Sequence, residues 1–104
     1  MADNTVKGSE GSTGDRGEVL LARGEQLALR KWEGEPEGTV APPHANPYEY
    51  VAYLVEGAMR IRIGDEPERE LAAGDSYVVP ADTEYTFEVI QRATVVEAVT
   101  VSAQ

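Results

Sequence analysis

Residues 44 to 57 read His-Ala-Asn-Pro-Tyr-Glu-Tyr-Val-Ala-Tyr-Leu-Val-Glu-Gly, and this run decides the fold. It follows an extended Pro42-Pro43 pair, and its second half has the aromatic and β-branched content of a strand. Side chains alternate between the two faces of a strand. We therefore expect one face to hold Tyr50, Ala52 and Leu54, and the other to hold Val51, Tyr53 and Val55.

Alternation continues on both sides of this run. Leu27 and Leu29 share one face of a predicted strand, whereas Ala28, Arg30 and Trp32 share the other. Further along, the pattern places Met59, Ile61 and Ile63 inward, with Arg60 and Arg62 outward. Glycine and proline turns separate the segments, so the sequence predicts an all-β sandwich or barrel. The predicted strands are 19–22, 26–32, 50–55, 59–63, 68–71, 76–80, 85–89 and 93–101, and 33–38 is predicted to be a loop.

Length and composition indicate one domain. A chain of 104 residues is long enough to bury a real core. Residues 1–17 are rich in glycine, serine and threonine and almost lack apolar side chains, so we expect a flexible tail there. Order in this tail would indicate a contact with a neighbouring subunit or a crystal contact. Residues 18–104 are expected to form the single folded domain.

Charge and apolar content exclude several classes of protein. The net charge of −10, with 19 acidic against 9 basic residues, argues against a nucleic-acid partner. The absence of cysteine excludes disulfides and thiolate metal sites. The longest apolar run, Val51 to Val55, is too short to span a bilayer, and the N-terminus does not read as a signal peptide. We therefore expect a cytoplasmic protein with no membrane partner.

Two spacings carry a family resemblance: Gly38-x5-His44-x-Asn46-x3-Tyr50-x6-Gly57 and Gly74-x5-Pro80-x-Asp82-x2-Tyr85. They resemble the two motifs of the cupins. The sequence around these motifs, from about residue 25 to 101, resembles that of small single-domain cupins. The resemblance implies an all-β jelly-roll barrel, the double-stranded β-helix of RmlC-like proteins.

The same resemblance implies a place for a divalent metal, formed by His44, Asn46, Tyr50 and Tyr85. Metal-dependent cupins usually have three histidines and a Glu or Gln at these positions, and this chain keeps only His44. A carboxamide and two protonated phenols are weak donors. We therefore expect no cofactor, and a metal held by these four residues is the less favoured alternative.

Without a metal, the same side chains suit acid–base chemistry. His44 is a candidate general base, Tyr50 and Tyr85 are candidate acids or hydrogen-bond donors, and Asn46 is a candidate to orient a carbonyl. Glu97 interrupts an apolar run, so on an inner face it would be a further acid or base. Trp32 is a candidate to line a ligand-binding pocket. The alternatives are structural: an exposed histidine, tyrosines that fill a former metal site, a Trp32 that only packs, and a Glu97 that faces solvent.

Three functions remain open. The first is a metal-independent isomerase, cyclase or lyase acting on a small carbonyl compound or sugar acid. This choice follows from the resemblance of the Pro-x-Glu and Val-Glu-Gly sequences to those of small cupins that ketonise unsaturated uronates. The second is a module that binds or senses a small molecule without converting it. The third is a metal-dependent cupin with unusual ligands. We also expect a homodimer formed through the N-terminal strands, whose edges would otherwise stay unpaired.

Overall fold

The structure is a computed structural model that describes residues 4–103. The alternating segments form strands, and every strand pair is antiparallel. Within the described residues the strands are β1 (Ser12–Thr13), β2 (Val19–Arg23), β3 (Leu27–Glu35), β4 (Val40–His44), β5 (Tyr50–Ile63), β6 (Arg69–Ala72), β7 (Ser76–Val79) and β8 (Tyr85–Thr100). Two short 3-10 helices, η1 (Gly8–Glu10) and η2 (Val101–Ala103), lie near the ends of this range.

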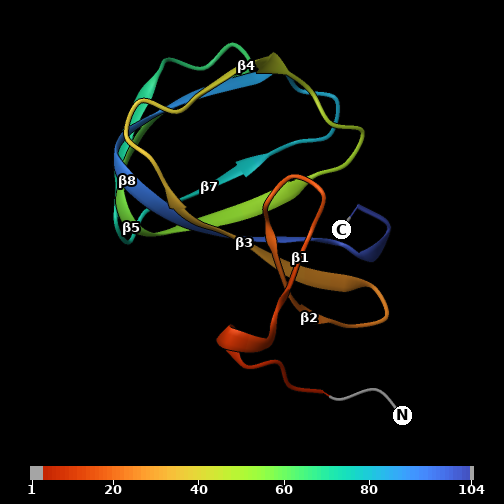
Figure 1. Cartoon of the computed structure of the whole chain (residues 1–104). Coiled ribbons are helices and arrows are strands. Elements are labelled where there is room, and N and C mark those ends of the chain that lie inside the picture. Colours follow the sequence, from red (N-terminus) through yellow and green to blue (C-terminus); the bar gives the residue numbers. More distant parts are fainter. Residues whose placement is uncertain (1–3, 104) are drawn as a thin grey trace.

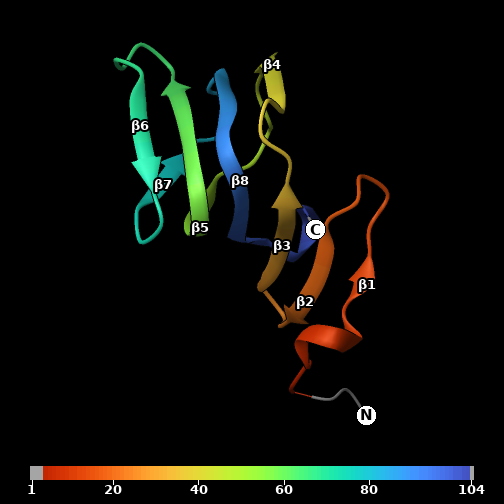
Figure 2. The same ribbon diagram turned by 60° about the vertical axis from the view of Figure 1, so that its left-hand side comes forward.

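The long strands β5 and β8 pair with each other and organise the sheet. Its order is β1-β2-β3-β8-β5-β6, with β4 added to β8 and β7 added to β5 (Figure 2). The first half of β5 pairs with β7 and its second half with β6. The first half of β8 pairs with β4, and its second half with β3. The sheet therefore curls into a barrel, from which the β1–β2 hairpin projects (Figure 1).

Gly57 lets β5 bend without ending. Its φ of 89° is in the region that favours glycine, and the β5–β8 register shifts on both sides of it. A Cβ at this position would collide with the backbone carbonyl of Arg92 on β8. Only glycine allows the two strands to approach this closely, so one strand can contribute to both ends of the barrel.

The inner faces of the strands form the core. Leu54, Met59, Val79 and Val99 have the largest side chains that are completely buried. The alternation predicted for 27–32 and 50–55 is confirmed, because Ala28, Arg30, Tyr50, Ala52 and Leu54 are buried while their neighbours are more exposed. Membrane-spanning helices are not found among residues 4–103.

Two predictions of local structure are wrong. The segment 33–38 is not wholly a loop, because β3 continues to Glu35 and pairs there with Ala93. The predicted strands 85–89 and 93–101 are one strand, β8, because pairing with β5 continues through Gln91. The prediction of a flexible tail covers residues 1–17, of which 1–3 lie outside the described part. Residues 4–17 include η1, β1 and a tight loop after β1.

Candidate functional site

The barrel encloses a cavity of about 300 Å³. Its lining comes from β3, β4, β5, β7 and β8 and from loops, including the one between β1 and β2. A volume of this size suits a small organic molecule. The structure brings together all six residues that the sequence singled out: Trp32, His44, Asn46, Tyr50, Tyr85 and Glu97.

Backbone pairing brings the two sequence motifs together at one side of this cavity. The N–H of Asp82 donates to the carbonyl of Asn46 at 2.7 Å, which ties the second motif to the first. Strands β4 and β8 place His44 directly opposite Tyr85, and their ring centroids are 4.4 Å apart. The imidazole and this phenol therefore form one contact at the rim.

His44 is exposed, and one of its ring nitrogens is already engaged. Nδ1 lies 3.1 Å from the carbonyl oxygen of Pro42, which can only accept, so Nδ1 carries the proton in the neutral ring. The second nitrogen, Nε2, then bears the lone pair. This tautomer gives His44 a basic nitrogen that can take a proton from a bound molecule.

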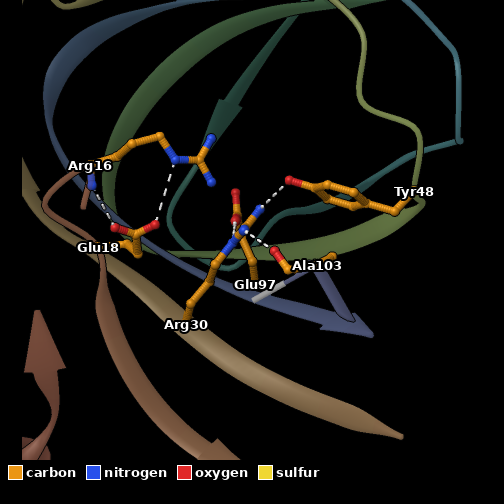
Figure 3. Close-up of polar contacts among 6 residues, drawn as sticks. All are labelled: Arg16, Glu18, Arg30, Tyr48, Glu97 and Ala103. Atoms are coloured by element: carbon orange, nitrogen blue, oxygen red, sulfur yellow. Dashed lines mark hydrogen bonds and ion pairs between the residues drawn. The ribbon is translucent and has the colours of Figure 1, made fainter. Parts of the chain in front are cut away.

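A buried ion pair lines the cavity. Arg30 on β3 and Glu97 on β8 are direct neighbours in register, and Arg30 Nε is 2.5 Å from Glu97 Oε1. Glu97 therefore faces inward, which the alternation alone could not decide. Arg30 also donates to the hydroxyl of Tyr48 and the carbonyl of Ala103, both at 3.4 Å (Figure 3). Burial acts to lower the pKa of Arg30, but Glu97 and Tyr48 outweigh it and raise that pKa.

Two phenols of the cavity stay protonated. Burial raises the pKa of Tyr50 far above its ordinary value, and nearby Tyr77 and Glu97 add to this effect. The pKa of Tyr77 is raised for the same first reason, burial, with Glu97 second. Their rings meet edge to face with centroids 6.3 Å apart. At neutral pH these side chains are hydrogen-bond donors and not phenolates.

The loop between β1 and β2 adds a second arginine. Glu18, 5% exposed, accepts the backbone N–H of Arg16 at 3.0 Å, and its Oε2 lies 3.6 Å from Arg16 Nε. The Arg16 guanidinium lies over Trp32, 5.8 Å from the ring centroid, and its terminal nitrogens point away from Glu18 (Figure 3). Arg16 lines the same cavity as Arg30.

Glu18 is held as a carboxylate. Burial acts to raise its pKa, but the N–H groups of Glu18 and Arg16 and the charges of Arg16 and Arg30 lower it overall. The charged Glu18 pairs with Arg16, which lines the cavity.

The four positions that the family resemblance assigns to a metal do not fit one. Only His44 offers a strong donor, and Tyr50 keeps its proton because burial raises its pKa. Across residues 4–103, no three His, Asp or Glu side chains are grouped to hold a metal ion. All fully buried side-chain nitrogens and oxygens of this range already have a hydrogen-bond partner. The donor chemistry therefore favours a hydrogen-bonding cavity.

Sequence reasoning missed six polar residues that line this cavity: Arg16, Arg30, Glu35, Thr39, Tyr48 and Tyr77. A signal existed for Arg30, because the alternation already placed it on the face of Ala28 and Trp32. An arginine on such a face needs a buried partner, which is Glu97. Arg16 had no comparable signal, because its stretch has no periodicity.

The comparison with protein families matches the cavity-bearing part of the chain. The family model described as Cupin domain matches residues 30–101. The chain belongs to the cupin family. This cupin therefore carries the two family motifs with three of their four usual metal donors replaced. No curated protein matches its sequence.

Solved structures show the same barrel. The protein is similar to an RmlC-like cupin from Shewanella frigidimarina NCIMB 400, with a TM-score of 0.81 and 21% identity over 95% of this chain and 91% of that one. Its likeness to KdgF from Halomonas sp. is equal in TM-score, 0.81, at 20% identity over 95% and 94% of the two chains. It is also similar to the polyketide cyclase RemF from Streptomyces resistomycificus, with a TM-score of 0.66 and 20% identity over 80% and 63%. The TM-scores support a shared jelly-roll fold.

Proposed function

We propose that this cupin is a metal-independent acid–base enzyme that moves a proton on a small carbonyl compound bearing a carboxylate, such as a sugar acid. The observation that carries the proposal is the composition of the cavity. It combines a basic imidazole nitrogen on His44, protonated phenols, and a buried Arg30–Glu97 pair. An acid, a base and hydrogen-bond donors of this kind suit proton transfer by an isomerase, a cyclase or a lyase.

The proposed chemistry is a proton transfer next to a carbonyl. His44 Nε2 takes a proton from the carbon beside the carbonyl, and the electrons of that C–H bond form an enolate. Tyr85, which contacts His44, and the protonated Tyr50 donate hydrogen bonds to the enolate oxygen. The imidazolium then returns the proton to another carbon or to a leaving group. Glu97 is the second candidate base, and Asn46 orients the carbonyl.

A carboxylate on the substrate matches the charge of the cavity mouth. Arg16 reaches the cavity from outside the strands, and Glu18 contacts it through its backbone N–H and Nε. Guanidinium groups recognise carboxylates through paired donors. Of the two arginines that line the cavity, Arg30 is buried against Glu97 and Arg16 is exposed, so Arg16 is the one proposed to receive the substrate carboxylate.

A structural neighbour supports the choice of an enzyme. The barrel is similar to that of a polyketide cyclase, so a cyclase is among the enzymes that this fold can form. Fold similarity does not transfer activity, and the proposal therefore stands on the cavity residues.

Deuterium exchange tests the proposal directly. The protein is incubated in D₂O with pyruvate, 2-oxobutyrate, D-glucuronate and D-galacturonate, and proton NMR follows loss of the signal beside the carbonyl. We expect exchange with at least one compound, with loss of about 100-fold in rate in His44→Ala. Glu49→Gln, which changes an exposed neighbouring position, is the matched control and should retain the wild-type rate. Equal exchange in His44→Ala and wild type would contradict the assigned base.

The same samples separate the other two functions. Saturation-transfer NMR that detects binding without any exchange would make the cavity a recognition site for small acids. Elemental analysis of protein purified without a histidine tag or chelator provides the second check. About one metal ion per chain would favour the metal-dependent alternative, with His44, Asn46, Tyr50 and Tyr85 at or near the ion.

A further inference from the structure

A bulge in β3 turns Glu35 toward the cavity. Trp32 and Glu35 are three residues apart on β3, but their partners on β8, Val95 and Ala93, are only two residues apart. β3 therefore contains one extra residue between them, which shifts the alternation of its side chains. Strict alternation from Trp32 would place Glu35 on the outer face. Instead, Glu35 lies opposite the buried Ala93 and lines the cavity.

Gly34 and Thr94 stabilise this bulge. The φ of Gly34 is 63°, a value that favours glycine. Its backbone N–H donates to Thr94 Oγ1 at 3.0 Å. Thr94, which is 6% exposed, donates in turn to Glu56 Oε1 at 3.2 Å, so its hydroxyl oxygen accepts from one side and its hydrogen is used on the other. Contacts outside the cavity thus maintain the backbone geometry that places Glu35 on the inner face.

Glu35 is the unpaired charge of the cavity. The charged residues in the lining are Arg16, Arg30, Glu35 and Glu97. Arg16 is paired with Glu18, and Arg30 with Glu97. The half-buried Glu35 forms no ion pair or side-chain hydrogen bond with any residue between 4 and 103. One negative charge of the lining is therefore left without a counter-charge, and a carboxylate in this position favours a cationic ligand group.

Thr39 presents a second acceptor beside the same turn. It follows Glu35 across residues 36–38 and also lines the cavity. Its hydroxyl donates to the carbonyl oxygen of Pro36 at 2.7 Å, so the lone pairs of Thr39 Oγ1 remain able to accept a hydrogen bond. A ligand group that satisfies both Glu35 and Thr39 must donate at least two hydrogen bonds. A hydroxyl group donates only one, whereas a primary ammonium group donates three.

We infer that Glu35 and Thr39 form a binding site for a primary ammonium group, so that the ligand of the cavity is a small acid that also carries an amine. This site extends the proposed function and rests on it for the substrate carboxylate at Arg16. A zwitterion of this kind has no net charge, so the net charge of −10 on the protein does not repel it. A ligand without an amine leaves the carboxylate of Glu35 without a counter-charge.

A matched pair of ligands tests the site. 5-Aminolevulinate carries a carboxylate, a ketone and an ammonium group, and levulinate lacks only the amine. Titration calorimetry should find that the wild type binds 5-aminolevulinate about tenfold more tightly than levulinate. Glu35→Gln should bind the two equally, and it should fold normally because Glu35 has no partner to lose. Glu37→Gln is the matched control, because Glu37 is exposed in the adjoining turn and does not line the cavity, and it should keep the tenfold difference.

Three results would overturn the ammonium site: equal binding of the two compounds by the wild type, a tenfold difference that persists in Glu35→Gln, or no binding of 5-aminolevulinate at millimolar concentration. Deuterium exchange beside the ketone of the same compounds measures the proposed function separately. Exchange without any preference for the amine rejects the ammonium site alone. A preference for the amine without exchange supports the site and rejects the proton transfer.

Discussion

Strand β5 has different surfaces on the two sides of Gly57. After Gly57, Met59 and Ile61 are buried in an apolar core, while Arg60 on the outside forms half-exposed ion pairs. Before Gly57, the inner side of the strand faces a cavity that holds a charged pair and phenols. The outer side of this first half is apolar, with Val51 and Tyr53 about half exposed.

The two halves of β5 therefore differ in which side chains they expose to solvent. The second half follows the usual rule of soluble proteins, with apolar side chains inside and charges outside. The first half departs from this rule on its outer side, where Val51 and Tyr53 are exposed, while Ala52 and Leu54 on its inner side are buried and apolar. The cavity with its charged pair and phenols and the exposed apolar side chains of β5 therefore lie on opposite sides of the same part of the sheet.

Among substitutions that test the difference between the two halves, we expect the largest loss of stability at Glu97. Glu97→Ala leaves the buried Arg30 without its partner, so the free energy of unfolding should fall by about 3 to 5 kcal/mol. Glu88→Ala removes a half-exposed partner of Arg60 in the second half and should cost about 0 to 1 kcal/mol. Urea denaturation measures both. Similar losses in the two variants would mean that the Arg30–Glu97 pair is not shielded from water.

A second prediction concerns alkaline pH. Because burial raises the pKa of Tyr50 in the folded state, the unfolded chain loses this proton first as pH rises above about 10. Stability from this group is complete below that pH and should then fall by up to about 1.4 kcal/mol per pH unit. Urea midpoints at pH 9, 10 and 11 should decline less steeply in Tyr50→Phe than in the wild type. Urea midpoints that decline equally in both proteins would contradict a buried, protonated Tyr50.

A third prediction concerns ligand charge. Arg16→Gln should weaken binding of D-glucuronate about tenfold, a loss of about 1.4 kcal/mol, and should change the unfolding free energy by less than about 0.5 kcal/mol. D-glucose, which lacks the carboxylate, should bind wild type and variant equally weakly. The control is Arg62→Gln, an exposed arginine on the second half of β5. Titration calorimetry that finds equal losses in both variants would attribute the effect to general charge.

The smallest predicted effect is at Glu18. Its pKa is lowered in the folded state, so its stabilisation is present above the unfolded value near 4.5 and is lost as pH falls through the folded value. Glu18→Gln should therefore be less stable than wild type at pH 7, by no more than about 1 kcal/mol. The difference in melting temperature should shrink between pH 5 and pH 3. A constant difference over this range would show that the carboxylate charge plays no part.

Much of this architecture could be predicted because strand side chains repeat every second residue. The faces of 27–32 and 50–55 follow from that period, and the motif spacings brought His44, Asn46, Tyr50 and Tyr85 to one cavity. The long course of β5 and β8 could not be predicted in this way. A glycine such as Gly57 reads as a turn in sequence, whereas here it bends a strand that continues.

The remaining parts of the site depend on contacts between distant residues. Arg30 and Glu97 are 67 residues apart, and only the register of β3 on β8 makes them neighbours. Arg16 depends on a loop held by Glu18, in a glycine-rich stretch without periodicity. Local pattern describes faces well, but it does not give register or the course of an irregular loop.

The hairpin that carries Arg16 precedes residues 30–101, the part that matches the family. An exchange of this hairpin changes the mouth of the cavity and leaves untouched the strands that hold His44, Tyr50 and Tyr85. Such an exchange has to keep the pairing of β2 with β3. For the proposed function, the loop of the hairpin is then the place at which recognition of a substrate carboxylate can be changed.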